Sequence, residues 1–301
     1  LYHNNGDGTF SDVTQSAGVG HRGYGMGVGT GDMNNDGFTD LYITNFGPNV
    51  LYQNNGDGTF SNITTTAGVG DDSWGTSCGF YDFDLDGDLD LYVVNYLHYP
   101  ASTWPCINLK TGLIEYCHPQ TLPPAKDVFY KNNGDSTFSL ANSEVGLDSV
   151  PAARGLGVGF GDFNADGLID IYVANDTDPN FLFFNRGRLF EEAGMATGTA
   201  LSKTGWPEGG MGVDVGDYNN DGWLDIFVTN TESNTLYQNM GDGTFFDVSE
   251  PTNLGGVTAA LVGFGTRFID FDNDGDLDLF VANGHVQDEI TITGELSVAP
   301  Q

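Results

Sequence analysis

Five short acidic segments carry the residues of this chain that are best suited to chemistry. Each is nine residues long, with Asp at positions 1, 5 and 9, Asp or Asn at position 3, and Gly at position 6. Ca²⁺ takes about six to eight oxygen ligands, and a short loop that turns sharply at a glycine can supply most of them. Because the pattern recurs five times at regular intervals, chance does not explain it. The segments therefore predict about five calcium sites.

We number these segments acidic loops 1 to 5; they are residues 32–40, 82–90, 162–170, 217–225 and 270–278. EF-hands are excluded, because position 12 is Ile or Val in place of the bidentate Glu and the loops lack helical flanks. The side chains predicted to bind Ca²⁺ stand at positions 1, 3, 5 and 9: Asp32, Asn34, Asp36, Asp40, Asp82, Asp84, Asp86, Asp90, Asp162, Asn164, Asp166, Asp170, Asp217, Asn219, Asp221, Asp225, Asp270, Asp272, Asp274 and Asp278.

Strand-like sequences flank every acidic loop. A glycine-spaced apolar run at 25–31 precedes loop 1, and residues 40–45, rich in Leu, Tyr and Ile, follow it. Runs of this composition, bounded by Gly and Asp, are typical of β-strands. Each acidic loop is therefore predicted to join two adjacent strands of one sheet.

A hairpin follows most of these strand pairs. Residues 51–64 include Asn-Gly and Asp-Gly, which supply the positive φ that a tight turn requires. The hairpin recurs at 1–14, 129–142 and 236–249, and in a degenerate form at 181–190. Four strands per unit, with loop starts 50 to 80 residues apart, are typical of a β-propeller blade.

The predicted fold class is therefore all-β, a single β-propeller of four-stranded blades over residues 1–301. The sequence starts with the second half of a blade and finishes with the first half of another. Residues 1–14 could complete the blade begun at 263–283 and close five blades. The favoured alternative is that further blades lie at both ends, with 284–301 the start of another blade or a tail.

Composition restricts the class of partner. The formal net charge is −33, from 42 acidic residues against nine basic ones. Nucleic acid requires a basic footprint, so it is excluded as a partner, and an anionic membrane is disfavoured. No run of 18 apolar residues is present, so no membrane insertion is expected. Bound Ca²⁺ would relieve part of the self-repulsion that opposes compaction.

An insertion of roughly thirty residues, about 96–127, separates loops 2 and 3 and contains Cys106 and Cys117. A disulfide between them would stabilise the insertion by roughly 3 kcal/mol on the chain-entropy model. A zinc pair with His98 and His118 is the competing interpretation. The disulfide is favoured, because the spacing fits no standard zinc motif and an acidic calcium protein suggests an oxidising compartment.

The sequence gives little support to catalysis. Its paired carboxylates are explained by metal ligation, and a bound cation would hold them ionised and unsuited to act as general acids. No nucleophile elbow, phosphate-binding loop or zinc-protease motif occurs, and the five histidines are scattered. The prediction is that the chain is not an enzyme.

Three aromatic residues form a candidate ligand face. Tyr24, Trp74 and Trp206 stand shortly before, or at, the first strand of their units, so they should emerge opposite the acidic loops. Glycan-binding proteins place such aromatics beside Asn and Asp. The alternative, which is favoured here, is that these side chains pack between blades.

The acidic loops, the Leu-Tyr-x-Asn-Asn-Gly-Asp-Gly-Thr-Phe hairpins and the cysteine-bearing insertion resemble the FG-GAP/VCBS repeat family. The resemblance covers nearly the whole chain and extends in particular to secreted proteins of the cartilage acidic protein and ASPIC/UnbV group. It implies an integrin-α-like propeller, often seven-bladed, with calcium in loops on one face. It also implies a backbone carbonyl ligand at position 7, from Phe38, Asp88, Leu168, Trp223 and Asp276.

The predicted function is that of a secreted or cell-surface calcium-binding module for adhesion, interaction or extracellular assembly. Its partner would be an extracellular protein, a glycan, or copies of itself. A calcium-dependent, lectin-like propeller is the alternative, and a propeller hydrolase or lyase is less favoured.

Overall fold

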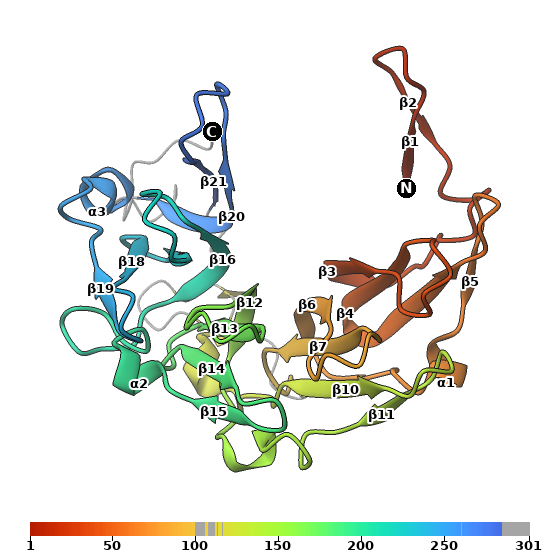
Figure 1. Ribbon diagram of the computed structural model, residues 1–301, viewed down its shortest axis with the longest axis horizontal. Helices are drawn as coiled ribbons and strands as arrows, with labels where there is room; N and C mark the ends of the chain where they lie inside the picture. The colour runs from red at the N-terminus through yellow and green to blue at the C-terminus, as the bar shows by residue number, and fades with distance from the viewer. Residues whose placement is uncertain (100–105, 108–111, 113, 116, 260, 285–301) are drawn as a thin grey trace. The chain divides into compact units, whose positions relative to one another are not determined.

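The computed structural model describes residues 1–99, 106–107, 112, 114–115, 117–259 and 261–284. The chain divides into two compact units. Unit 1 comprises residues 1–95 and 127–143, and unit 2 comprises residues 96–126 and 144–301. Both are built from short antiparallel sheets with a few single-turn helices (Figure 1). The sequence after residue 284, predicted to start a further blade or a tail, lies outside the described residues.

Unit 1 holds one four-stranded sheet, one three-stranded sheet and the N-terminal hairpin, in the orders β11-β10-β7-β6, β3-β4-β5 and β1-β2. Its elements are β1 (Tyr2–Asn4), β2 (Phe10–Asp12), β3 (Tyr24–Gly31), β4 (Asp40–Asn54), β5 (Phe60–Asn62), α1 (Thr64–Ala67), β6 (Gly75–Tyr81), β7 (Asp90–Asn95), β10 (Val128–Asn132) and β11 (Phe138–Leu140).

Unit 2 holds two four-stranded sheets, β12-β13-β14-β15 and β16-β17-β18-β19, with the pairs β20-β21 and β8-β9. Its elements are β8 (Cys106–Ile107), β9 (Ile114–Glu115), η2 (Pro119–Thr121), η3 (Leu147–Ser149), β12 (Gly155–Gly161), β13 (Asp170–Asn175), β14 (Phe181–Asn185), β15 (Phe190–Glu192), α2 (Gly194–Thr197), β16 (Gly210–Gly216), β17 (Asp225–Asn230), β18 (Thr235–Asn239), β19 (Phe245–Asp247), α3 (Leu254–Thr258), β20 (Val262–Ile269) and β21 (Asp278–Gly284).

The four-stranded antiparallel sheets confirm the all-β class and the blade-like units. One blade differs from the expectation of four separate strands, because β4 runs through the second and third positions as one element. Its first part pairs with β3 from Asp40 to Phe46, and its last part pairs with β5 from Tyr52 to Asn54. Closure of the blades into a propeller, with five or seven blades, stays a prediction.

Glycines in the first strands β3, β12 and β16 allow neighbouring sheets to approach closely. A Cβ on Gly27 would lie 2.4 Å from the carbonyl oxygen of Thr76, and one on Gly157 would lie 2.3 Å from that of Met211. Any side chain at these positions would clash with backbone, which leaves little room for relaxation. The glycine-spaced runs before the acidic loops are therefore packing requirements between adjacent first strands.

The second strand of each complete blade lies in the core. Every residue of β7, β13 and β17 is buried. In unit 2, Tyr172 and Tyr237 join one buried cluster with Phe163 and Phe245, and in unit 1 Tyr42 joins another. The Tyr, Phe, Val, Ile and Leu side chains of these strands thus supply the hydrophobic core, while the Asp and Asn at the strand ends contact the adjoining loops.

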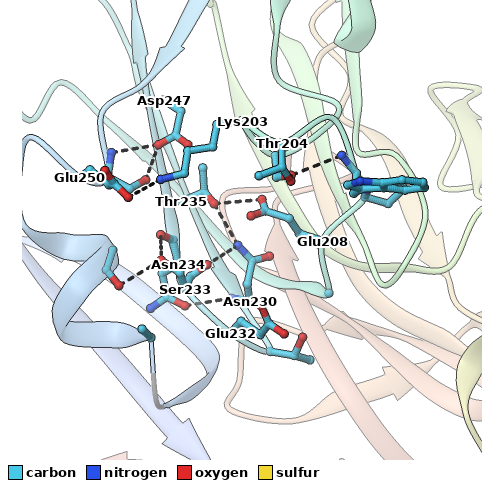
Figure 2. Close-up of a pocket in the computed structure, with 18 of the residues that line it drawn as sticks. Lys203, Thr204, Glu208, Asn230, Glu232, Ser233, Asn234, Thr235, Asp247 and Glu250 are labelled. Carbon is cyan, nitrogen blue, oxygen red and sulfur yellow. Dashed lines mark hydrogen bonds and ion pairs between the residues drawn. The ribbon is translucent and has the colours of Figure 1, made fainter.

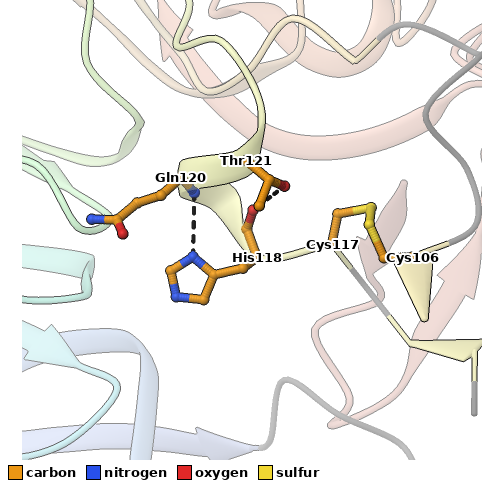
Figure 3. The surroundings of a disulfide bond; sticks show 5 residues. All are labelled: Cys106, Cys117, His118, Gln120 and Thr121. Carbon is orange, nitrogen blue, oxygen red and sulfur yellow. Dashed lines mark hydrogen bonds between the residues drawn. A yellow bond between two sulfur atoms is a disulfide. The ribbon is translucent and has the colours of Figure 1, made fainter. Parts of the chain in front are cut away.

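The insertion is closed by the predicted disulfide (Figure 3). Cys106 and Cys117 are bonded, and Nδ1 of His118 accepts a hydrogen bond from the Gln120 N–H at 3.3 Å, which caps η2. The alternative of a zinc pair is therefore wrong, because both thiols are consumed in the bond. Arg154 holds the end of the insertion by donating from Nε to the carbonyl of Pro119 at 2.9 Å.

The third cysteine, Cys78, is free and partly buried in β6, where it packs against the core of unit 1. Burial raises its thiol pKa to about 12, so it behaves as the small apolar residue that the sequence predicts. Within the described residues, the helices are too short and too polar to cross a membrane.

Candidate calcium loops and a polar cavity

Each acidic loop joins the first two strands of a blade, as predicted. Loops 1 and 2 connect β3 to β4 and β6 to β7, and loops 3, 4 and 5 connect β12 to β13, β16 to β17 and β20 to β21. The two strands pair up to the ends of the loop, with Gly161 opposite Asp170 in loop 3. The sheet therefore fixes both ends of a tight nine-residue turn.

Backbone hydrogen bonds curl each loop around its own carboxylates. In loop 3, Asp162 accepts from the N–H groups of Asp166 (3.1 Å) and Gly167 (2.9 Å) through its two oxygens. Asp166 in turn accepts from the N–H of Leu168 at 3.0 Å. The same two acceptors, at positions 1 and 5, recur in the other four loops.

Position 4 of every loop adopts left-handed backbone, which the sequence pattern did not reveal. The residues there are Asn35, Leu85, Ala165, Asn220 and Asn273, with φ between 56° and 60°. Asn tolerates this conformation better than Leu or Ala, and the glycine at position 6 also has positive φ. Two left-handed residues in one short loop turn it sharply enough to bring its side chains together.

The carboxylates at positions 1, 3 and 5 converge in the two loops that have Asp at all three. Oxygens of Asp82, Asp84 and Asp86 lie within 4.8 Å of one another, as do those of Asp270, Asp272 and Asp274. Clustered hard oxygen donors fit Ca²⁺ rather than a soft metal. In loops 1, 3 and 4 position 3 is Asn, whose amide oxygen is equally suited. The carbonyl ligands expected at position 7 stay a prediction.

The Asp at position 9 has a role in the sheet that sequence analysis missed. In four loops it is buried, and its two oxygens accept N–H groups from position 2 and from the Asn that ends the third strand of the blade. Asp170, for example, accepts from Phe163 at 2.9 Å and from Asn185 at 2.8 Å. The Leu-Tyr-x-Asn motif that recurs in the hairpins could have predicted this contact, because its Asn is the residue that donates to position 9. These aspartates are Asp40, Asp90, Asp170 and Asp225.

Burial raises the pKa of these position-9 carboxyls, because desolvation disfavours their charged form. The pKa rises to about 7 for Asp90 and Asp170 and to about 6 for Asp225, while the backbone N–H donors oppose the shift. A nearby divalent cation would lower the pKa again. Asp278 of loop 5 is exposed and accepts one N–H, from Phe271 at 3.0 Å.

Basic side chains reach two of the loops. The Lys131 ammonium, on β10, forms an ion pair with Asp84 and lies 3.6 Å from Asp86. In loop 3, the Arg186 guanidinium lies 3.6 Å from Asp166. Both side chains come from the hairpin of the same blade, so the blade itself supplies a counter-charge at these acidic clusters.

One pair of neighbouring acidic loops is linked in each unit. In unit 1, the Asn35 side chain of loop 1 donates to Asp88 of loop 2 at 2.9 Å. In unit 2, the Asn220 side chain of loop 4 donates to Asp276 of loop 5 at 2.9 Å. Both bonds join position 4 of one loop to the position-7 side chain of the next, so adjacent candidate sites share a physical contact.

The three candidate ligand-face aromatics fall into two places. In unit 1, Trp74 packs on Phe46 with ring centroids 4.8 Å apart, and Phe46 also contacts Tyr24 at 6.5 Å. Tyr24 is 78% exposed. In unit 2, Trp206 is 73% exposed and lines a cavity of about 620 Å³. The expected packing role thus describes Trp74, whereas Tyr24 and Trp206 present their rings to solvent.

This cavity lies at the end of the β16-β19 blade opposite acidic loop 4 (Figure 2). Its walls come from the segment before β16, the turn between β17 and β18, the end of β19, and α3. Its charged lining residues are Lys203, Glu208, Glu232, Asp247 and Glu250. Sequence analysis singled out Trp206 alone, because the charged residues are scattered over the 47 positions from Lys203 to Glu250 and only the fold gathers them.

Strand–acidic loop–strand units, each followed by a hairpin that returns an Asn to the loop, define a repeat protein of the blade type. The FG-GAP-like repeat model matches residues 1–43, 32–93, 162–228 and 217–281. These matches cover more than half of the sequence, and the chain belongs to the FG-GAP-like repeat family.

Curated relatives agree with this assignment. Human cartilage acidic protein 1 is 31% identical over 165 residues, a match that covers 52% of this chain and 24% of the human protein. Mouse cartilage acidic protein 1 is 32% identical over 151 residues, covering 47% of this chain and 21% of the mouse protein. The chain therefore spans about a quarter of the length of these relatives.

Two solved structures are more distant. A lectin of Agrocybe aegerita that recognises non-reducing terminal N-acetylglucosamine has 17% identity and a TM-score of 0.46, covering 93% of this chain and 68% of the lectin. The V. cholerae biofilm matrix protein Bap1 has 18% identity and a TM-score of 0.41, covering 86% of this chain and 35% of that protein. Neither likeness bears on which ligand this chain binds.

Proposed function

We propose that this chain is an extracellular interaction module whose blades are held by Ca²⁺ in the acidic loops. It contacts a protein or glycan partner, or further copies of itself, and it carries out no catalysis. The observation that supports the calcium assignment most directly is the convergence of three carboxylates in loops 2 and 5.

The loop backbone prepares each site for a cation. N–H groups at positions 5, 6 and 7 already orient the carboxylates at positions 1 and 5, so little ordering is left for the ion to impose. When bound, Ca²⁺ supplies positive charge that offsets the repulsion among these carboxylates. The bound ion and its acidic ligands then hold the first two strands of a blade together at the loop.

The hydrogen bonds that the loop carboxylates accept support a role in binding rather than catalysis. The carboxylates at positions 1, 5 and 9 accept backbone N–H groups within their own blade, and this fixes them in structural turns. A general acid needs a proton to donate near neutral pH and access to substrate. In the loops, carboxylates next to a cation would be fully ionised.

The proposed extracellular location rests on the Cys106–Cys117 disulfide and on the loops themselves. Disulfides persist in oxidising compartments, and extracellular Ca²⁺ at millimolar concentration suits modules of modest affinity. An acidic chain with net charge −33 would also remain well dispersed there.

Sedimentation velocity in millimolar Ca²⁺, and again with excess chelator, tests this proposal. We expect a higher sedimentation coefficient with Ca²⁺. Without Ca²⁺ the carboxylates of each loop repel one another, and the chain expands. A monomer in Ca²⁺ would direct the search to protein or glycan partners, and calcium-dependent assemblies would identify the partner as another copy. Identical sedimentation in both buffers would contradict the proposal. Mg²⁺ at the same concentration is the matched control.

A further inference from the structure

The cavity next to Trp206 has the charge of a site for a cationic ligand. Four carboxylates line it, and its one ammonium, Lys203, is already engaged in an ion pair with Glu250. Glu208 is oriented by the Thr235 hydroxyl, which donates to its Oε2 at 3.0 Å (Figure 2). Because carboxylates outnumber ammonium groups on the walls, a complementary ligand carries positive charge and N–H or O–H donors.

Two buried amide atoms on the wall lack a partner within the described residues. Asn230 and Asn234 are each 1% exposed, yet Asn230 Oδ1 and Asn234 Nδ2 make no hydrogen bond. A buried polar atom without a partner is costly, so a rotation of either amide that brings it to a ligand hydroxyl is favoured. The unpartnered amide oxygen recurs at the equivalent strand ends of other blades, at Asn45 in unit 1 and Asn175 in unit 2, and it is the combination with an acidic cavity that marks Asn230 and Asn234.

Trp206 supplies an aromatic surface at the same cavity. Its backbone is held by the Ser202 N–H, which donates to the Trp206 carbonyl at 2.9 Å, while the side chain is 73% exposed. An exposed indole face attracts both the C–H face of a sugar ring and an ammonium group. The surrounding Ser, Thr and Asn side chains provide the short polar contacts that sugar hydroxyls require.

We propose that this cavity binds a saccharide bearing a free amino group, with oligomers of glucosamine as the simplest example. The hydroxyls match the Asn and Thr lining, the ammonium matches Glu208 and Glu232, and a ring stacks on Trp206. The inference rests on the proposed function, since it names a partner for an interaction module.

Isothermal titration of the calcium-loaded chain with the glucosamine tetramer tests the inference. The fully N-acetylated tetramer and a tetramer of galacturonic acid are the neutral and anionic comparisons. We expect the amino form to bind at least about tenfold more tightly than the acetylated form, and the anionic form not to bind. Trp206→Ala should weaken binding about tenfold, a loss of about 1.4 kcal/mol. Glu208→Gln should reduce the preference for the amino form.

Tyr24→Ala is the matched control, because Tyr24 is an exposed aromatic at the corresponding place in another blade. It should leave binding unchanged. Absence of binding, equal affinity for the acetylated form, or full affinity in Trp206→Ala would each overturn the inference. Thermal melts with and without Ca²⁺ distinguish the two proposals. If Ca²⁺ stabilises the chain but glucosamine does not bind, only the ligand assignment is contradicted. A chain that Ca²⁺ does not stabilise would contradict the proposed function instead.

Discussion

Position 5 of an acidic loop is the single side chain at which calcium dependence should be most visible. Asp274 converges with Asp270 and Asp272 and accepts the Asp276 N–H at 2.9 Å. We predict that Asp274→Ala lowers the melting temperature in millimolar Ca²⁺ and changes it little in chelator. A site of modest affinity filled at about ten times its Kd contributes roughly 1.4 kcal/mol, which corresponds to a few degrees.

Asp242→Ala is the control for that substitution. Asp242 lies in the exposed hairpin turn of unit 2, where it accepts from the Thr244 N–H at 3.0 Å, outside the acidic loops. Its loss should be equal in both buffers. An equal loss for Asp274→Ala as well would show that Asp274 acts only as a turn residue.

The buried position-9 aspartates predict an unusual pH dependence in the absence of Ca²⁺. Burial raises the pKa of Asp90 and Asp170 to about 7, above the ordinary value of 3.8 that they regain on unfolding. The folded state therefore holds protons that the unfolded state releases, and this stability is lost as pH rises through 7. Denaturant unfolding in chelator should give greater stability at pH 5 than at pH 8. In Ca²⁺ the difference should shrink or reverse, and a chelated protein that gains stability toward pH 8 would contradict the pKa assignment.

Among the elements, the contact between neighbouring acidic loops carries a prediction of its own. Asn220→Gly removes the bond to Asp276 while keeping the left-handed backbone that position 4 needs. We expect calcium binding at loops 4 and 5 to become less coupled, by about 0.5–1.5 kcal/mol in a double-mutant cycle with Asp276→Ala. Ala165→Gly, at the same position of loop 3, is the control. Additive effects on calcium titration would mean that the loops bind independently.

The sequence predicted the elements better than their contacts. Strand, acidic loop and hairpin are encoded within about thirty residues, so local propensity and turn residues are enough to predict them. The disulfide followed from two cysteines in one insertion. The paired bonds of Asp170, in contrast, depend on how loop 3 meets strand β14, and the approach of Gly157 to Met211 joins two blades.

The cavity was the least predictable feature. It depends on segments before β16, between β17 and β18, and at α3, and none of them has a distinctive motif. Trp206 was visible because it stands shortly before a first strand, as Tyr24 and Trp74 do in other units, but Glu208 and Lys203 belong to no such pattern. The length of β4 was also missed, since residues 46–50 looked like a break between two strands.

For the whole molecule, charge and calcium are linked. A net charge of −33 opposes compaction, and every bound Ca²⁺ offsets two of these charges. Loops 2 and 5, each with five aspartates, contribute most to that repulsion, and in loop 2 Lys131 already offsets part of it. We therefore propose that Ca²⁺ bound in the loops is what allows so acidic a chain to stay compact.

Equilibrium dialysis of the purified chain against millimolar Ca²⁺, with the bound metal counted by atomic emission, tests this claim most directly. We expect about five Ca²⁺ per chain, falling by one or two in Asp274→Ala and unchanged in Asp242→Ala. A folded chain that retains no Ca²⁺ above the buffer would contradict it, and the acidic loops would then be turns alone.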